Sequence, residues 1–291
     1  MYPLEGPMDE IDVRHPCFSA AAKNKYSRIH LPVAPLCNLQ CRYCDRNYSC
    51  VNESRPGVTA SLITPKEAVD VVGKILQSNL NVSVVGIAGP GDPLANPNQT
   101  FETFRLIRAA YPDLLLCLST NGLALPNYAD EILDLGITHL TVTVNAIDPV
   151  IASQIYAYVT TSAGRLCGID AAKYLLECQE EGVRRLSTSL TIKVNTVVIS
   201  GLNDSHIPAI AAQVSLWGAK MMNCIPLLPV AGTALAKFSP PNKADLHHWQ
   251  HLAEQYLPQM RHCSRCRADA VGLLHDSSKL CTWQNEALSC C

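Results

Sequence analysis

Apolar positions along the chain recur with two different periods, and the two kinds of segment alternate from about residue 28 to residue 227. Short runs rich in β-branched and aliphatic residues indicate strands, and segments with apolar residues three to four positions apart indicate amphipathic helices. The predicted strands span 28–34, 82–88, 114–120, 139–145, 189–198 and 221–227. The predicted helices span 65–77, 100–109, 129–135, 169–181 and 206–217.

The order of these elements predicts the fold class. Strand–helix alternation repeated about six times implies parallel strands joined by right-handed crossovers. A closed TIM barrel has eight such units, so we expect an α/β fold with a partial, open (βα)6 TIM-type barrel. The predicted organisation is an N-terminal extension (1–27), the partial barrel (28–232) and a C-terminal extension (233–291).

Two helix boundaries carry local signals. Thr64 followed by Pro65 and Glu67 is typical of a helix start, with a hydroxyl N-cap, proline at the first helical position and an early acidic residue. Gly136 follows a predicted helix where a left-handed C-cap is expected.

Composition narrows the function classes. The chain has 291 residues, a formal net charge of −2 and only 16% charged residues, which argues against a nucleic-acid-binding surface. No apolar run approaches the ~18 residues of a membrane span, and the acidic first ten residues do not resemble a signal peptide. We therefore expect a cytoplasmic protein. In that reducing compartment, the 14 cysteines favour metal binding over disulfides.

Polar residues collect directly after the predicted strands. Parallel barrels carry their functional residues at the C-terminal ends of strands and in the loops that follow. One face of this barrel is therefore expected to carry the chemistry. The polar, glycine-bearing or cysteine-bearing segments are 35–44, 89–92, 119–122, 145–148, 195–204 and 226–232.

The strongest motif is Cys37, Cys41 and Cys44 after the first strand, with the aromatic Tyr43 before the last cysteine. Three thiolates can ligate three irons of a 4Fe–4S cubane and leave the fourth iron open. An open iron can bind the amino and carboxylate groups of S-adenosylmethionine (SAM), which the cluster then cleaves reductively. The alternative is a zinc loop, but zinc sites normally draw four ligands from two paired knuckles. The motif is typical of the radical SAM superfamily.

Other strand-end residues are predicted to form a SAM pocket. Gly89, Gly91 and Asp92 resemble the glycine-rich second motif of that superfamily, although a structural turn is the alternative. Tyr43 is also placed at this pocket. Polar residues near the ends of apolar strands need partners that a ribose and a carboxylate could supply, although each could be a satisfied core residue. The remaining predicted SAM contacts are Ser119, Asn121, Thr143, Asn145, Lys193, Asn195 and Ile199.

Further cysteines have positions that invite metal binding. Cys50 lies six residues past the triad, Cys117 lies within a strand, and Cys17 follows His15 and Pro16. The knuckle of Cys263 and Cys266 fits zinc or iron–sulfur equally well. His30 lies inside the first strand, where a lone histidine is more often a core residue. Six cysteines without spacing logic are interpreted as structural or terminal, namely Cys167, Cys178, Cys224, Cys281, Cys290 and Cys291.

Several segments together resemble the NifB family of nitrogenase cofactor maturases. They are His-Pro-Cys at 15–17, Ala-Pro at 34–35 before Cys-Asn-Leu-Gln-Cys at 37–41, Cys-Val-Asn-Glu-Ser-Arg-Pro-Gly at 50–57, Gly-Ile-Ala-Gly-Pro-Gly-Asp-Pro-Leu-Ala-Asn at 86–96, and Cys-Ser-Arg-Cys-Arg-Ala-Asp-Ala at 263–270. The resemblance extends from about His15 to Leu274. We expect the short form of the family, without the C-terminal domain that resembles cofactor carriers.

The resemblance implies a specific reaction. The family fuses two 4Fe–4S clusters into an eight-iron core with a central carbide, a precursor of the nitrogenase cofactor. SAM supplies both the methyl group that becomes the carbide and the radical that abstracts hydrogen from it. The implied partners are SAM, an iron–sulfur cluster donor, a reductant protein and a downstream carrier or scaffold protein, with no nucleic acid and no membrane.

The resemblance also implies two ligand sets besides the triad. His30, Cys50 and Cys117 would bind one substrate cluster, and Cys17, Cys263 and Cys266 the other. The terminal extensions that carry the second set would cover the open mouth of the barrel. The roles of Glu53 and Arg55 stay open between orienting clusters or substrate and a surface ion pair.

Two alternative functions remain. One is a radical SAM enzyme that modifies a peptide and uses the additional cysteines for permanent auxiliary 4Fe–4S clusters. The other is a non-catalytic iron–sulfur scaffold or carrier without a SAM site.

Overall fold

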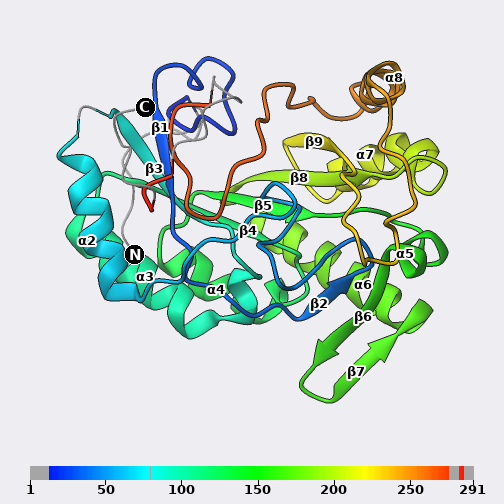
Figure 1. Cartoon of the computed structure of the whole chain (residues 1–291), viewed down its shortest axis with the longest axis horizontal. Coiled ribbons are helices and arrows are strands. Elements are labelled where there is room, and N and C mark those ends of the chain that lie inside the picture. The colour runs from blue at the N-terminus through cyan, green and yellow to red at the C-terminus, as the bar shows by residue number, and fades with distance from the viewer. Residues whose placement is uncertain (1–12, 79, 275–281, 285–291) are drawn as a thin grey trace.

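A curved sheet of seven strands forms the centre of the structure, a computed structural model that describes residues 13–78, 80–274 and 282–284 (Figure 1). The strand order is β10-β1-β3-β4-β5-β8-β9, parallel except for the antiparallel edge strand β10. The six predicted strands and the partial barrel are confirmed. The bounds are β1 (Ser27–His30), β3 (Val82–Ile87), β4 (Leu115–Thr120), β5 (His139–Thr143), β8 (Thr191–Val198), β9 (Met221–Pro226) and β10 (Val271–Gly272).

The connecting helices lie outside the curved sheet (Figure 1). The five predicted helices are confirmed as α2 (Pro65–Leu76), α3 (Pro97–Ala110), α4 (Leu125–Asp134), α6 (Gly168–Leu186) and α7 (Ile207–Leu216). Thr64 and Glu67 form the expected capping box, and Gly136 has the expected positive φ of 64°. The short α5 (Pro149–Ile155) and the polar α8 (Lys243–Ala253) were not predicted, because neither shows a sustained apolar period.

A second, three-stranded antiparallel sheet was not predicted either. It has the order β2-β6-β7, with β2 (Leu39–Cys41), β6 (Tyr156–Thr161) and β7 (Gly164–Cys167). Figure 1 shows the β6–β7 hairpin extending away from the barrel. Because β2 pairs with β6, this small sheet supports the backbone between the first two cysteines of the triad.

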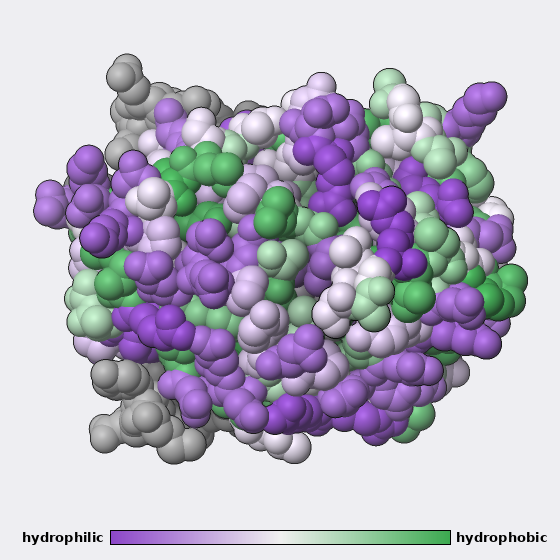
Figure 2. Space-filling view, turned by 90° about the horizontal axis from the view of Figure 1, so that it is seen from below, coloured by the Kyte–Doolittle hydropathy of each residue, from purple (hydrophilic) through white to green (hydrophobic). Residues whose placement is uncertain are grey.

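The main core packs between the parallel sheet and the outer helices, and it is almost entirely aliphatic and aromatic. The face of the molecule that carries the lower helices is mostly hydrophilic, and its apolar side chains are scattered (Figure 2). All eight residues of β8 are buried. On the inner side of the sheet they include the polar residues Lys193 and Asn195. Buried polar groups on that side require partners, which points to a site inside the barrel.

The segments at the two ends of the described chain lie together beside β1 (Figure 1). β10 pairs with β1 through Arg28 opposite Gly272 and Ile29 opposite Val271. A strand of two residues carries no alternation, which is why the sequence did not predict it. The boundaries proposed for the two extensions stay predictions.

Among the described helices, none combines the length and the apolar character needed to cross a membrane.

Candidate functional site: two adjoining cavities

The first cavity opens at the C-terminal ends of β3, β4 and β5 and has a volume of about 970 Å³, counting the space at its mouth. All three cysteines of the triad line it, together with Cys50. Further lining residues are Tyr43, Asn52, Glu53, Gly91, Asp92, Ser119, Asn121 and Thr143.

The loop of the triad is held by hydrogen bonds that do not involve the thiols. Gln40 Nε2 donates to Cys41 O at 3.0 Å and to Cys44 O at 2.9 Å, which fixes the turn between these two cysteines. Arg46 donates to Gln40 Oε1 at 3.1 Å and to the carbonyl of Leu39. The backbone of the loop is therefore formed without metal, and the thiols remain available as ligands.

The thiols of this cavity fit an iron–sulfur cluster better than a single ion. Burial raises the pKa of Cys37, Cys41, Cys44 and Cys50, so the metal-free groups are neutral thiols. No three or more His, Cys, Asp or Glu side chains of the described residues converge closely enough to hold one metal ion. A cubane attaches each thiolate to a different iron, so its ligands are spread further apart than those of one ion. Cys37, Cys41 and Cys44 all line the same cavity, as three ligands of one cluster would.

Gly91 allows the loop after β3 to approach the triad loop. A Cβ atom at this position would lie 2.1 Å from Leu36 O, which no side chain tolerates. The amide of Gly91 donates to Ala34 O at 2.6 Å, and that of Asp92 donates to Leu36 O at 2.7 Å. The sequence analysis predicted that these amides contact SAM. In the structure both amides donate to carbonyls that precede the triad, and these hydrogen bonds join the two loops. Any SAM contact of Gly91 stays a prediction.

Asp92 joins two segments, its own loop after β3 and the end of β4, through its carboxylate. Its oxygens accept hydrogen bonds from Leu94 N at 2.9 Å, from Asn121 N at 2.6 Å and from Thr120 Oγ1 at 3.0 Å. Burial raises its pKa, while these donors act in the opposite direction. The carboxylate therefore fixes the ends of β3 and β4 relative to each other, next to the triad.

Tyr43 and Asn145 belong to one buried network. Asn145 Nδ2 donates to Tyr43 OH at 2.7 Å, and Tyr43 OH donates to Asn52 Oδ1 at 2.8 Å. The sequence placed both residues at SAM, but only Tyr43 lines the cavity. Asn145 Oδ1 accepts from Val197 N at 2.8 Å, and its SAM contact stays a prediction. Neither Gly89 nor Ile199 lines the first cavity.

Asn121 is the polar residue that lies closest to a thiol of the triad. Its Nδ2 lies 3.6 Å from Cys37 Sγ and donates to Asn38 Oδ1 at 2.7 Å. The carbonyl of Asn121 accepts from Gln179 Nε2 at 2.7 Å, and Gln179 also donates to Thr143 O at 2.9 Å. Gln179, on α6, was missed by the sequence analysis because a glutamine in an amphipathic helix gives no signal of its own.

The second cavity lies against the first. Asn52, Glu53, Ala88 and Ser119 line both. The second cavity contains five of the six predicted ligands outside the triad, from strands β1 and β4 and from both terminal segments. These are His30, Cys117, Cys17, Cys263 and Cys266. Cys50 instead lines the first cavity, so the set of His30, Cys50 and Cys117 implied by the resemblance spans the two cavities.

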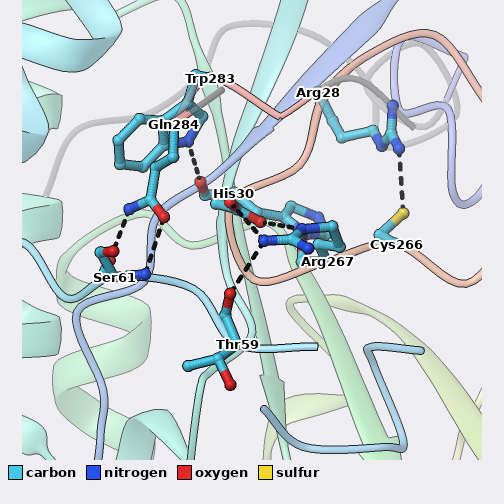
Figure 3. A network of polar contacts seen from close by, with 9 residues as sticks. Arg28, His30, Thr59, Ser61, Cys266, Arg267, Trp283 and Gln284 are labelled. Carbon is cyan, nitrogen blue, oxygen red and sulfur yellow. Dashed lines mark hydrogen bonds and ion pairs between the residues drawn. The ribbon is translucent and has the colours of Figure 1, made fainter. Parts of the chain in front are cut away.

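The tautomer of His30 is one that can ligate a metal. Its Nδ1 lies 3.0 Å from the carbonyl of Arg267, which can only accept a hydrogen bond, so the proton of the neutral ring is on Nδ1 (Figure 3). Nε2 is then free to bind a metal, as in many metal sites where the other ring nitrogen is fixed by a carbonyl. Burial, and next the charge of Arg28, lower the pKa of His30 to about 4. The imidazole is therefore neutral at physiological pH.

Two buried cations face the thiols of this cavity. Arg28 Nη2 donates to Cys266 Sγ at 3.2 Å (Figure 3). Its Nη1 donates to the carbonyls of Gly272 and Leu273. Lys193 Nζ donates to Cys17 O at 3.3 Å. Burial raises the pKa of Cys17 to about 12 despite these cations. A cavity that combines thiols with buried positive charge favours an anionic ligand.

Lys193 and Asn195 were expected at the SAM pocket, and the structure places both in the second cavity. Asn195 Nδ2 donates to Glu53 Oε1 at 2.8 Å, at the wall that the two cavities share. Burial raises the pKa of Glu53. Arg28 was missed, although a charged residue at the start of a largely apolar strand was a signal for it. Cys281, Cys290 and Cys291 lie outside the described residues.

The comparisons with known proteins agree with this geometry. The sequence profile of the radical SAM superfamily matches residues 31–214. The FeMo cofactor biosynthesis protein NifB of Chlorobaculum tepidum is 45% identical over 89% of this chain, and that of Klebsiella pneumoniae is 47% identical over 89%. The resemblance to the NifB family is therefore confirmed. The matched regions cover only 62% and 57% of those two proteins.

Solved structures share the fold at low sequence identity. Methylornithine synthase superposes with a TM-score of 0.53 at 14% identity, over 87% of this chain and 68% of that one. The anSMEcpe chain with bound AdoMet and a peptide superposes with a TM-score of 0.52 at 16% identity, over 79% of this chain and 62% of that one. These likenesses support the partial barrel alone.

Proposed function

This chain belongs to the radical SAM superfamily, and we propose that it is a maturase of the nitrogenase cofactor that joins two 4Fe–4S clusters into an eight-iron, carbide-centred precursor. The observation that carries the proposal is the shared wall between a cavity lined by the triad and a cavity lined by His30 and four cysteines. A SAM-cleaving site and a substrate site must adjoin for a short-lived radical to be used.

In the first cavity, Cys37, Cys41 and Cys44 would hold the SAM-cleaving cluster. When bound, a 4Fe–4S cluster with one open iron supplies the electron that splits the sulfonium of SAM and generates a 5′-deoxyadenosyl radical. Asn121 orients the Cys37 thiol, and Asp92 fixes the strand ends beside the triad. Asn121, Ser119 and Thr143, which line the cavity, would bind the polar groups of SAM.

In the second cavity, the clusters are substrates. We assign one to Cys17, Cys263 and Cys266, and one to His30 and Cys117 with Cys50, which lines the first cavity. Three protein ligands leave iron free to react, and a neutral imidazole in place of a thiolate lowers the negative charge of the site. Arg28 and Lys193 offset part of the charge that the substrates bring. The methyl group of one SAM would supply the carbide, and a second SAM the hydrogen-abstracting radical.

The test is an anaerobic assay on protein reconstituted with iron and sulfide, reduced with dithionite and given SAM with a labelled methyl carbon. We expect 5′-deoxyadenosine, S-adenosylhomocysteine and label retained in an acid-extractable iron–sulfur species. Exposed Cys167, which lines neither cavity, provides the Cys167→Ser control for cysteine substitution.

Other outcomes would identify a different function. Deoxyadenosine without label in the cluster would contradict cluster fusion and favour an enzyme that modifies a peptide. The absence of both nucleosides would leave only an iron–sulfur carrier.

A further inference from the structure

His15 lies in the N-terminal segment, two residues before Cys17, and its ring lines the second cavity. The side chain is 2% exposed. Its ring packs against Phe18, at a centroid distance of 4.6 Å, and against His139, at 4.3 Å, and these two rings also contact each other. The carbonyl of His15 accepts from the amides of Phe18 and Ser19, so both the backbone and the ring are fixed.

The hydrogen bonds of the ring determine where its proton lies. Nδ1 of His15 accepts from the amide of Cys17 at 3.1 Å, so the neutral ring carries its proton on Nε2. Nε2 is buried and has no hydrogen-bond partner within the part of the chain that the structure describes. A buried N–H donor without an acceptor is costly, and its retention beside a cavity indicates that a ligand supplies the acceptor.

The surroundings of His15 determine the chemistry of that acceptor. Lys193 Nζ lies 4.6 Å from the centroid of the Phe18 ring and has only neutral hydrogen-bond partners, Cys17 O and Met260 Sδ at 3.8 Å. Arg28 donates to Cys266 Sγ from the same cavity. Donors and cations that surround thiols favour an anionic ligand with sulfur acceptors, which describes an iron–sulfur cluster.

We propose that His15 is a positioning residue that donates its Nε2–H to a sulfur of the substrate cluster held at Cys17. The proposal rests on the proposed function, because it needs a cluster at that site. A hydrogen bond to sulfur stabilises the more negative, reduced state of a cluster and raises its reduction potential. His15 therefore controls the electron affinity of the substrate without ligating iron.

The test compares variants in a full-length background that carries Cys37→Ser, Cys41→Ser and Cys44→Ser, so that only substrate clusters load. Reconstituted protein is titrated with reductant and followed by electron paramagnetic resonance. His15→Asn keeps an acceptor for the Cys17 amide and removes the Nε2–H. We expect one cluster signal to become harder to reduce by about tenfold in its equilibrium constant, which is about 59 mV for one electron. His15→Gln, which restores a donor near Nε2, should recover most of that shift.

The matched control is His206→Gln. His206 also accepts a backbone amide, that of Ile147 at 3.2 Å, and it lines neither of these cavities. The His206→Gln variant should leave the reduction potentials of both substrate clusters unchanged. Denaturation of the iron-free proteins separates a structural role from the proposed one, because His15→Asn and His15→Gln both lose the packing of the ring and should have similar midpoints.

Two outcomes would overturn the inference alone. One is a loaded His15→Asn protein with unchanged potentials, and the other is a lowered denaturation midpoint without a shift in potential. A background that binds no cluster would instead overturn the proposed function, and the inference with it.

Discussion

The two cavities share a wall but are built from different lengths of chain. The first takes its ligands from eight consecutive residues, 37–44, held by hydrogen bonds within the loop and by the neighbouring strand ends. The second takes its ligands from residues 17 to 266, which come from two barrel strands and from both terminal segments. A local motif thus forms one site, and the completed fold forms the other.

The difference also extends to charge. The first cavity holds thiols beside the buried carboxylate of Asp92 and the guanidinium of Arg46, and Glu53 lines both cavities. The second holds thiols beside the buried cations Arg28 and Lys193 and two histidines. The greater buried positive charge of the second cavity supports the proposal that it binds anionic substrate clusters.

The largest expected effect comes from removing one ligand of the first cavity. Cys44→Ser should reduce 5′-deoxyadenosine formation to the level of iron-free protein, because SAM cleavage needs the open-iron cluster. Bound iron should fall by roughly one third, since one of three proposed clusters is lost. Chromatography of the reaction products and iron analysis provide the measurements. Normal deoxyadenosine formation by this variant would contradict the assignment of the triad.

The corresponding change in the second cavity should separate the two activities. Cys263→Ser removes an exposed thiol of the proposed substrate site. We expect deoxyadenosine formation within about twofold of the parent, because Cys263 does not line the first cavity, and no methyl label in the extracted cluster. Equal losses of both products would mean that the cavities do not act separately.

His30 provides a pH-dependent test of the second cavity. Its pKa is lowered to about 4 by burial and by Arg28, whereas in the unfolded chain it is about 6.5. Between these values the unfolded chain takes up a proton that the folded protein refuses, so stability is lost as pH falls from 6.5 to 4. The loss is on the order of 3 kcal/mol.

His30→Asn should flatten this dependence in the iron-free protein, measured by chemical denaturation at several pH values. Asparagine can still donate to the carbonyl of Arg267, so the variant mainly removes the titrating group. His15, whose pKa is also lowered by burial, should account for a remaining slope. Parallel curves for parent and variant would show that His30 is not buried as described.

Asp92→Asn tests the connection between the strand ends beside the triad. The amide has only one acceptor oxygen, so it cannot accept from both Leu94 N and Asn121 N, which donate to the two different oxygens of the carboxylate. We expect a loss of about 2 kcal/mol in the free energy of unfolding of the iron-free protein. The control is Asp134→Asn on the exposed end of α4, which should change it by less than about 0.5 kcal/mol. A neutral Asp92→Asn variant would rule out the structural role.

The barrel could be predicted from the sequence because each of its strands is a clear apolar run next to an amphipathic helix. The hairpin of β6 and β7 was not predicted, although Tyr156–Thr161 is rich in aromatic and β-branched residues. Only strands that alternate with helices were assigned from the sequence. The edge strand β10 exists only through its pairing with β1, and no local pattern could reveal it.

The sites differ in the same way. The triad was predictable because its ligands are neighbours in the sequence. The alternation of β8 placed Lys193 and Asn195 on the inner face, but it could not tell which of two adjoining cavities they would line. No role was predicted for His15 or Arg28, because the role of each depends on segments more than 100 residues away, such as the one that carries Cys266.

The separation of Cys17 and Cys266 along the chain also sets an order in time. During synthesis, the residues that line the first cavity have all been made by Thr143, whereas the second cavity must await the segment around Cys266. At ~5–20 residues per second, that interval lasts on the order of 10 s. The nascent chain thus contains every residue that lines the first cavity, proposed for the cofactor, at a time when part of the second cavity, proposed for the substrate, has not yet been synthesised.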